Sequence, residues 1–371
     1  GFGKQAGTSY GRRVPSLGLE LACGYHADVV RPLLQARWPA LQYAAARLGG
    51  GSEVLGLDDE TSRDHDFGLR LVLLVGPDWV QPVRQLLQAE LPESYAGWPT
   101  RFATTWDPDP GHHHIDVLPF EELALRVLGL PPDADWEPAD WLSLTGQAVL
   151  EVTAGAVFHD SPGQLTALRR RLEWYPPDVE RYIIATDWRR LAQELPMVGR
   201  TGQRGDDAGS RVVAGRLART VMHLGLVLCR RWPPYAKWLG TNVVREQRLA
   251  AVAGVLDDVL AASDWSDRQT ALAAAANSVH EVQREMGLST GSGPAVQPFH
   301  DRPFLVVRDS VAQLLLDDVT DPQVRSLPAG VGSVEQWVDS VDVLLDAARR
   351  RAATAAALSS ADTSTAAGAG P

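Results

Sequence analysis

The pattern of hydrophobic and polar positions changes about a third of the way along the chain. Up to about residue 128, short apolar runs with the character of strands alternate with segments of helical spacing. The clearest strand candidates are residues 64–75 (DHDFGLRLVLLV) and 112–120 (HHHIDVLPF), and a helical pattern near the start ends close to Pro39. This alternation predicts an α/β or α+β domain.

The rest of the chain is dominated by helical periodicity. After the acidic, proline-rich segment 131–141 (PPDADWEPADW), alanine, leucine and arginine recur at helical spacing. The predicted helices cover residues 164–174, 178–194, 208–231, 243–262, 266–286 and 302–317. Ser333 and Gln336 have the spacing of a capping box and predict one last helix over residues 334–353. The fold class we predict is α+β, with an N-terminal mixed β-sheet and flanking helices followed by a C-terminal helical bundle.

Composition shifts along the chain predict its division into segments. We expect a flexible leader over residues 1–17, because this glycine-rich stretch has no helical or strand pattern. The sheet-containing domain is predicted at 18–130, the helical domain at 131–320 and a terminal helix region at 321–355. The low-complexity end, 356–371, is predicted to be a disordered tail.

Composition and charge narrow the class of protein. The 371 residues are 45% hydrophobic and 22% charged, as in a globular protein. No apolar run reaches the ~18–20 residues that span a bilayer, and the glycine-rich start lacks the apolar core of a signal peptide. Cys23 and Cys229 are too few for a disulfide framework or a cysteine zinc site, so a cytoplasmic location is expected. The net charge of -11 argues against a general nucleic-acid binder.

Candidate chemistry begins in the stretch GGGSEVLGLDDETSRDHD, residues 49–66. On a strand, Asp64 and Asp66 point to the same face and His65 to the other. Two adjacent carboxylates repel each other, and a divalent cation bound between them would remove that repulsion. Mg²⁺ prefers oxygen ligands and is commonly held by one or two carboxylates together with substrate phosphates.

The glycines ahead of this pair suggest a phosphate-binding loop. Gly49, Gly50 and Gly51 allow backbone conformations closed to other residues, so that successive N–H groups can turn toward an anion. Ser52 adds a hydroxyl donor. Opposite a metal-bearing carboxylate pair, such a loop is expected to hold the phosphates of a nucleoside triphosphate.

Asp116 is the candidate third carboxylate. It lies between Ile115 and Val117 in a predicted strand, where a charged side chain needs a partner such as a metal ion. Asp116 is expected either to ligate a second ion or to act as a general base. An alternative is a zinc site formed by Asp116 with His112–His114, although three adjacent histidines on a strand cannot all face one ion.

The order of these parts resembles the nucleotidyltransferase superfamily of the kanamycin nucleotidyltransferase and DNA polymerase beta type. Its signature is Gly-Ser, a spacer of about ten residues, an Asp-x-Asp pair and a third acidic residue on a later strand. Gly51-Ser52, Asp64/Asp66 and Asp116 match these positions in turn.

A second resemblance is to a bacterial family of uncharacterised nucleotidyltransferase-like proteins, catalogued as a domain of unknown function. The motifs GSEVLG, SRDHDFG, PPYAKWLGT and DRPFLV carry it, over about residues 40 to 310. Phe67 and Leu69 stand where that family's motif has Trp and Pro, and neither change removes a ligand.

The resemblance implies a catalytic domain that binds a nucleotide and two Mg²⁺ ions. It also implies a helical domain that binds the acceptor. The reaction is in-line attack of an acceptor hydroxyl on the α-phosphate of a nucleoside triphosphate, ATP being the first expectation, with release of pyrophosphate. Asp64, Asp66 and Asp116 would hold the metal ions, and Asp116 would also act as base. Gly50, Gly51 and Ser52 would bind the triphosphate.

Two motifs in the helical part offer further phosphate-binding candidates. Arg200 lies in VGRTGQRGDDAGSR, where Asp206 or Asp207 can instead cap a helix. Lys237 lies in RRWPPYAKWLG, whose aromatic residues can stack on a base or form a rigid corner between helices.

Three functions are compatible with these features. The first is nucleotidyl transfer to a hydroxyl of a small molecule, such as an antibiotic or a specialised metabolite. The second is the same transfer to a protein or a tRNA. The acidic composition disfavours tRNA as the acceptor. The third is a non-catalytic nucleotide-binding or toxin–antitoxin-type module. No membrane partner is expected.

Overall fold

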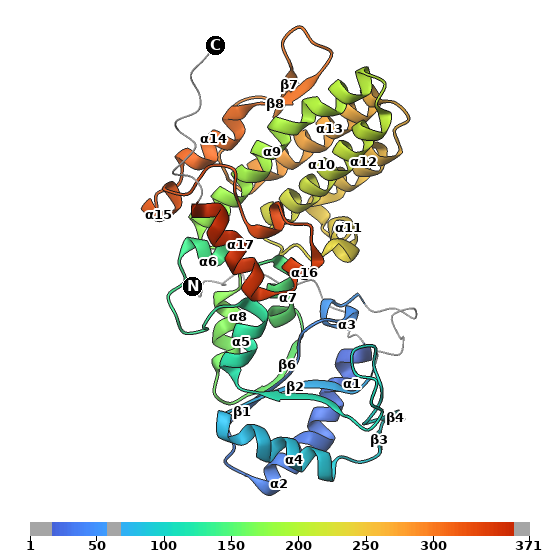
Figure 1. Ribbon diagram of the computed structural model, residues 1–371, viewed down its shortest axis with the longest axis vertical. Helices are drawn as coiled ribbons and strands as arrows, with labels where there is room; N and C mark the ends of the chain where they lie inside the picture. Colours follow the sequence, from blue (N-terminus) through green and yellow to red (C-terminus); the bar gives the residue numbers. More distant parts are fainter. Residues whose placement is uncertain (1–16, 58–67, 360–371) are drawn as a thin grey trace, which may run out of the picture. The chain divides into compact units, whose positions relative to one another are not determined.

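The chain folds into two compact units, seen in the computed structural model, which describes residues 17–57 and 68–359. Unit 1 comprises the described parts of residues 1–127 and 150–173, and unit 2 comprises the described parts of residues 128–149 and 174–371. A mixed β-sheet lies in unit 1, and unit 2 is mainly helical (Figure 1). The predicted α+β class is confirmed.

The sheet of unit 1 has four strands. They are β1 (Tyr43–Arg47), β2 (Arg70–Val75), β5 (His114–Leu118) and β6 (Ala156–Asp160), in the order β5-β2-β1-β6. Strand β1 runs antiparallel to both β2 and β6, while β2 and β5 are parallel. Two shorter strands, β3 (Ser94–Tyr95) and β4 (Trp98–Pro99), form a separate ladder between β2 and β5 in the sequence.

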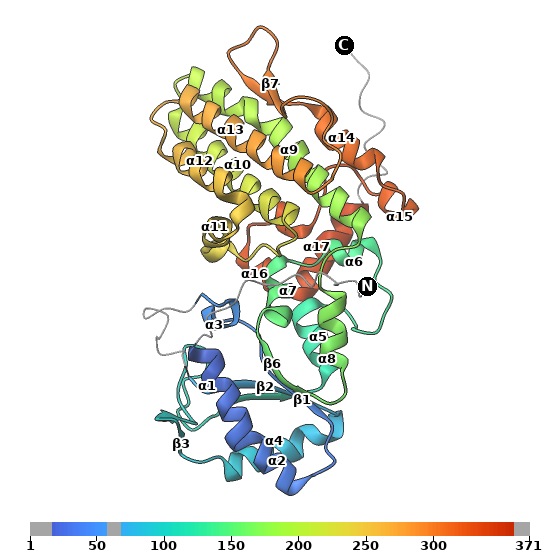
Figure 2. The same cartoon turned by 180° about the vertical axis from the view of Figure 1, so that it is seen from behind.

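Alternation along the strands gives this sheet two different faces. One face presents Leu71, Leu73, Ile115 and Val117 to a hydrophobic core. Helices on that side supply the rest of the core (Figure 2). They are α1 (Leu17–Tyr25), the π-helical turn η1 (His26–Val30), α2 (Arg31–Arg37) and α4 (Val80–Glu90). The short 3₁₀ helix η3 (Pro77–Trp79) precedes α4. The elements α1, η1 and α2 are the helical pattern that the sequence predicts to end near Pro39.

The opposite side of the sheet carries α5 (Phe120–Leu128) and α8 (Gln164–Arg171) (Figures 1 and 2). The short helix α3 (Ser52–Leu55) follows β1, and α7 (Gly146–Thr153) precedes β6. Helices α5 and α7 each cross the division between the two units.

Strand β6 comes from a segment that sequence analysis assigns to no element. It is an edge strand, and all five of its residues are half-buried, so the sequence shows no clear alternation. Gly155 makes the approach to β1 possible, because a Cβ atom there would lie 1.8 Å from the carbonyl oxygen of Arg47. The sheet therefore includes residues beyond the predicted boundary at 130.

Unit 2 is built around four helices packed side by side (Figure 1): α9 (Pro177–Gln203), α10 (Asp207–Leu228), α12 (Ala250–Ala261) and α13 (Trp265–Glu285). The remaining elements are α6 (Pro138–Leu142), α11 (Ala236–Arg245), η4 (Gln247–Leu249), β7 (Val296–Pro298), β8 (Leu305–Val307), α14 (Asp309–Asp317), α15 (Pro322–Arg325), η5 (Val334–Gln336), α16 (Val341–Leu344) and α17 (Ala347–Ser359). Among the residues that the structure describes, no helix is both long and apolar enough to cross a membrane.

The predicted helix over residues 334–353 is not continuous: the structure has η5, α16 and the first part of α17 there. The capping box of Ser333 and Gln336 is present, but it opens the single turn η5. The side-chain amide of Gln336 donates to the carbonyl of Ile183 on α9 at 2.9 Å, which fixes this turn to the bundle. Extended backbone at Ser340 then separates η5 from α16. Similarly, the predicted helix 302–317 starts only at α14, because its first residues contribute β8.

Candidate functional site

The glycine-rich loop connects the end of β1 to the start of α3. Gly49 and Gly51 have φ angles of 83° and 134°, a region that favours glycine. The N–H of Gly49 donates to the carbonyl of Glu151 at 2.8 Å, so this glycine anchors the loop within unit 1.

A buried ion pair supports the loop. The Arg47 side chain is 4% exposed, and its Nε donates to Oε1 of Glu53 at 3.1 Å. The same guanidinium donates to the carbonyl oxygens of Leu48 and, at 3.0 Å, of Gly50. Arg47 thus holds the loop through its backbone and through the first turn of α3. A buried pair of this kind fixes geometry even where its net contribution to stability is small.

Three donors of the loop have no acceptor among the residues that the structure describes. They are the N–H groups of Gly50 and Gly51 and the hydroxyl of Ser52. Because backbone N–H groups and hydroxyls are good anion donors, the loop can bind a phosphate oxygen.

Asp116 lies on the face of the sheet opposite the hydrophobic core described above. In the β2–β5 ladder, Arg70 pairs with His114 and Val72 with Asp116, so Arg70, His114 and Asp116 point to the same side. The Asp116 side chain is 40% exposed, and its Oδ2 accepts a hydrogen bond from Nη2 of Arg126 on α5 at 2.6 Å. Its partner is therefore a cation, as expected for a carboxylate on a strand.

Arg70 connects this face to the glycine loop. Its Nη1 lies 4.0 Å from Oε1 of Glu53, the residue directly after Ser52. The described side chains here, Arg47, Glu53, Arg70, Asp116 and Arg126, comprise three guanidinium groups and two carboxylates.

The three histidines before Asp116 contact different partners. His112 is exposed and lies 2.9 Å from Asp107, whose hydrogen bond raises the pKa of the imidazole. Burial lowers the pKa of His113 to about 4, and Nε2 of His114 lies 2.7 Å from the carbonyl of Phe102. No group of three potential metal ligands occurs among residues 17–57 and 68–359. The zinc alternative therefore gains no support from the histidines.

Asp64 and Asp66 lie outside the described residues. Arg200 and Lys237 belong to unit 2, where both contact aromatic rings. The guanidinium of Arg200 lies 5.5 Å from the ring centre of Phe299, and Nζ of Lys237 lies 4.8 Å from that of Trp238.

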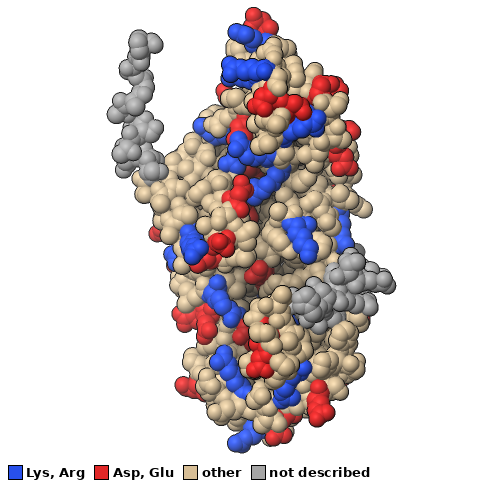
Figure 3. Space-filling model, turned by 45° about the vertical axis from the view of Figure 1, so that its right-hand side comes forward, with Lys and Arg blue, Asp and Glu red and all other residues tan. Residues whose placement is uncertain are grey.

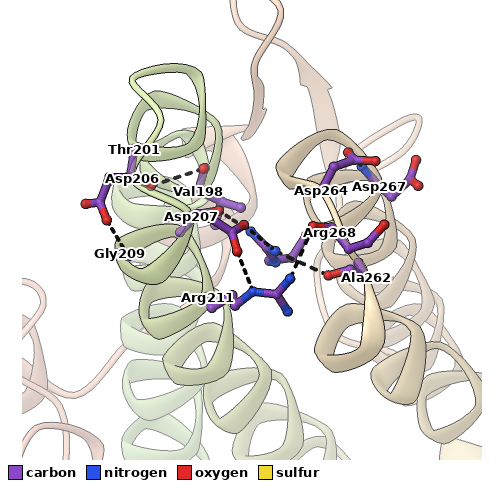
Figure 4. Close-up of polar contacts among 12 residues, drawn as sticks. Val198, Thr201, Asp206, Asp207, Gly209, Arg211, Ala262, Asp264, Asp267 and Arg268 are labelled. Carbon is purple, nitrogen blue, oxygen red and sulfur yellow. Dashed lines mark hydrogen bonds and ion pairs between the residues drawn. The ribbon is translucent and has the colours of Figure 1, made fainter.

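The segment that follows Arg200 has a structural role (Figure 4). Asp206 caps α10 by accepting a hydrogen bond from the N–H of Gly209 at 2.8 Å. Asp207 accepts from Nε of Arg211 at 2.7 Å and from Nη2 of Arg268 at 2.9 Å. The first of these bonds lies within α10, and the second joins the start of α10 to the buried Arg268 of α13. The helix cap, one of the two sequence interpretations of these aspartates, is confirmed for Asp206.

Sequence analysis missed Arg47, Glu53, Arg70 and Arg126. Two of these residues could have been noticed in the sequence as charges within apolar runs: Arg70 begins RLVLLV, and Arg47 ends YAAAR. Arg126 has no local signal, since its contact with Asp116 depends on how α5 folds back after β5.

Comparisons with known proteins give limited matches. A family model described as Domain of unknown function (DUF4037) matches residues 141–239, a range that includes Arg200 and Lys237 but none of the loop residues or Asp116. A crystal structure of a nucleotidyltransferase-like protein from Exiguobacterium sibiricum 255-15 is 12% identical, with 72% of this chain and 78% of that chain covered and a TM-score of 0.34. This similarity is too low to establish a shared fold. No curated protein matches the sequence.

Proposed function

We propose that this protein is a Mg²⁺-dependent nucleotidyltransferase. It transfers NMP from an NTP, ATP first among them, to a hydroxyl of a small molecule such as an antibiotic or a specialised metabolite, and releases pyrophosphate. The observation that carries the proposal is that Asp116 and Arg70 point to the same face of the sheet, while Arg70 lies 4.0 Å from Glu53, the residue directly after the Gly50–Ser52 loop.

The proposed metal ligands are Asp64, Asp66 and Asp116. The donor set suits Mg²⁺, because all three are carboxylates and the Asp116 side chain is accessible to solvent. Asp64 and Asp66 enter this ligand set from the sequence alone. When bound, Mg²⁺ would neutralise charge on the triphosphate and the leaving pyrophosphate.

The side chains of the site suit the steps of the reaction. The acceptor hydroxyl oxygen forms a bond to the α-phosphorus while the bond from that phosphorus to the bridging oxygen breaks, so that pyrophosphate leaves. The hydroxyl proton passes to the carboxylate of Asp116, the proposed base. The N–H groups of Gly50 and Gly51 and the hydroxyl of Ser52 hold the phosphates, and Arg70 adds positive charge nearby. Phosphate binding by Arg200 and Lys237 stays a prediction from the sequence.

Pyrophosphate release over a panel of hydroxyl-bearing acceptors tests the proposal. Wild type is compared with Asp116→Asn, with Asp64→Asn/Asp66→Asn, and with Asp78→Asn, which removes an exposed carboxylate elsewhere in unit 1. Removing a metal ligand or a base should lower turnover by at least about 100-fold, whereas Asp78→Asn should leave it unchanged. Full activity of the double variant would exclude the proposed metal site.

The two alternatives give different results in the same assay. A macromolecular acceptor would appear as labelled protein or tRNA after incubation of a lysate with labelled NTP. The net charge of -11 disfavours tRNA as the acceptor. On the face that Figure 3 shows, basic and acidic side chains are interspersed. A non-catalytic module would bind NTP and release no pyrophosphate with any acceptor.

A further inference from the structure

We propose that Trp106 is the platform on which the nucleobase of the bound NTP stacks. This inference rests on the proposed function and assigns a residue to the base, for which the sequence gives no candidate in unit 1. Trp106 is 55% exposed, while its ring contacts two side chains on the same sheet face as Asp116.

The first contact links Trp106 to the phosphate-binding loop. The guanidinium carbon of Arg70 lies 4.8 Å from the centre of the Trp106 ring. The same guanidinium lies 4.0 Å from Glu53, the residue after Ser52. One arginine therefore lies between the ring and the loop, and a ligand with phosphates at the loop can reach the ring with its other end.

The second contact links Trp106 to the strand that carries Asp116. The ring of His114 meets Trp106 edge-on, with centroids 6.4 Å apart and an interplanar angle of 77°. His114 and Asp116 point to the same side of β5. The aromatic surface thus lies next to the proposed reaction site, and more than half of the residue is still open to solvent.

The turn that carries Trp106 is held in place before any ligand binds. The N–H of Thr104 donates to the carbonyl of Asp107 at 2.7 Å, and the N–H of Asp107 donates to the Thr104 hydroxyl at 3.1 Å. Oδ2 of Asp107 lies 2.9 Å from Nδ1 of His112. A preorganised aromatic ring loses little conformational entropy when a base stacks on it.

Stacking predicts a specific pattern of affinity. Every base has a π-face, so loss of the platform should weaken ATP, GTP, CTP and UTP analogues to a similar extent, by about tenfold. Tripolyphosphate, which has no base, should bind equally well with and without Trp106.

Calorimetric titration of the full chain in Mg²⁺ tests this pattern. The probes are non-hydrolysable analogues of the four nucleotides and inorganic tripolyphosphate. The variants are Trp106→Ala, Trp106→Phe, which keeps an aromatic face, and Trp79→Ala as the control. Trp79 is a partly exposed tryptophan of the same unit that contacts Trp38, a residue packed against the core on the other face of the sheet.

We expect the tenfold loss only in Trp106→Ala and only for nucleotides, with Trp106→Phe close to wild type. Unchanged nucleotide affinity in Trp106→Ala would refute the platform and leave the proposed function intact. An equal loss for tripolyphosphate would also refute it, because Trp106 would then merely support Arg70. If the wild type bound neither nucleotide nor tripolyphosphate, the proposed function itself would fail, and the platform with it.

Discussion

At the scale of single residues, the candidate carboxylate Asp116 already has a cationic partner. Arg126 and Asp116 are 49% and 40% exposed, and an ion pair with this exposure contributes at most about 1 kcal/mol. A divalent cation can therefore displace the arginine at little cost. If Mg²⁺ binds Asp116 as proposed, Arg126 competes with the metal ion for the same carboxylate oxygen.

Replacing Arg126 should strengthen metal binding. The change Arg126→Gln removes both the competitor and a repelling positive charge, so the affinity for Mn²⁺ or Mg²⁺ without nucleotide should rise about two- to five-fold. Metal titration followed by calorimetry measures this effect. Arg37→Gln, on α2 across the sheet, serves as the control, and weaker metal binding by Arg126→Gln would contradict the competition.

At the scale of elements, the loop between β1 and α3 combines two glycines of different character. A Cβ atom at Gly51 would lie 2.5 Å from the Glu53 carboxylate, and its φ of 134° strains any other residue. Gly50 has no atom within 4 Å of such a Cβ and no positive φ. Gly50 is therefore a matched control for a substitution at Gly51 in the same loop.

The substitution Gly51→Ala should lower the free energy of unfolding by about 1–3 kcal/mol, because it forces a strained backbone against the Arg47–Glu53 pair. Gly50→Ala should leave the free energy unchanged or raise it by up to about 1 kcal/mol, since it restricts only the unfolded chain. Urea unfolding measures both. Equal losses at the two positions would show that the loop does not have the described conformation.

The elements also show what could be predicted from the sequence. Strands β2 and β5 were predictable, because apolar runs such as RLVLLV are long enough to identify. Strand β6 was not predictable, because the five half-buried residues of this edge strand show no alternation of polar and apolar positions. Its position also depends on the close packing of Gly155 against the backbone of Arg47. Asp116 was found as a charge within an apolar strand, whereas its partner Arg126 depends on tertiary structure alone.

At the scale of the whole molecule, His223 of unit 2 and the pair His26 and His113 of unit 1 should respond to pH in opposite directions. In unit 2, Nδ1 of His223 on α10 lies 2.6 Å from Asp187 on α9, and Nε2 lies 3.6 Å from Glu335. Burial lowers the pKa of His223, but the two carboxylates outweigh it and raise the pKa to about 9. In unit 1, burial lowers the pKa values of His26 and His113 to about 4.

Unit 2 should therefore lose stability in alkali. Because the pKa of His223 is higher in the folded chain than the usual 6.5, its contribution is complete below about pH 6.5 and is lost as pH rises through about 9. The loss should be on the order of 3 kcal/mol. Urea unfolding between pH 6 and 10 measures the slope, which His223→Gln should reduce between about pH 6.5 and 9. An identical slope in the variant would contradict this role.

The reverse holds for unit 1, where His26 and His113 stay neutral in the folded state. Their contribution is complete above about pH 6.5 and is lost as pH falls toward 4. The contributions of His223, His26 and His113 are therefore complete together near pH 6.5.

The central claim is that one face of the unit 1 sheet binds a nucleoside triphosphate together with Mg²⁺. Its most direct test is calorimetric titration of wild type and Asp64→Asn/Asp66→Asn with a non-hydrolysable ATP analogue, with and without Mg²⁺. The account predicts binding that requires Mg²⁺ in the wild type and is lost in the double variant. Nucleotide binding of equal affinity in both proteins, with or without Mg²⁺, would contradict it.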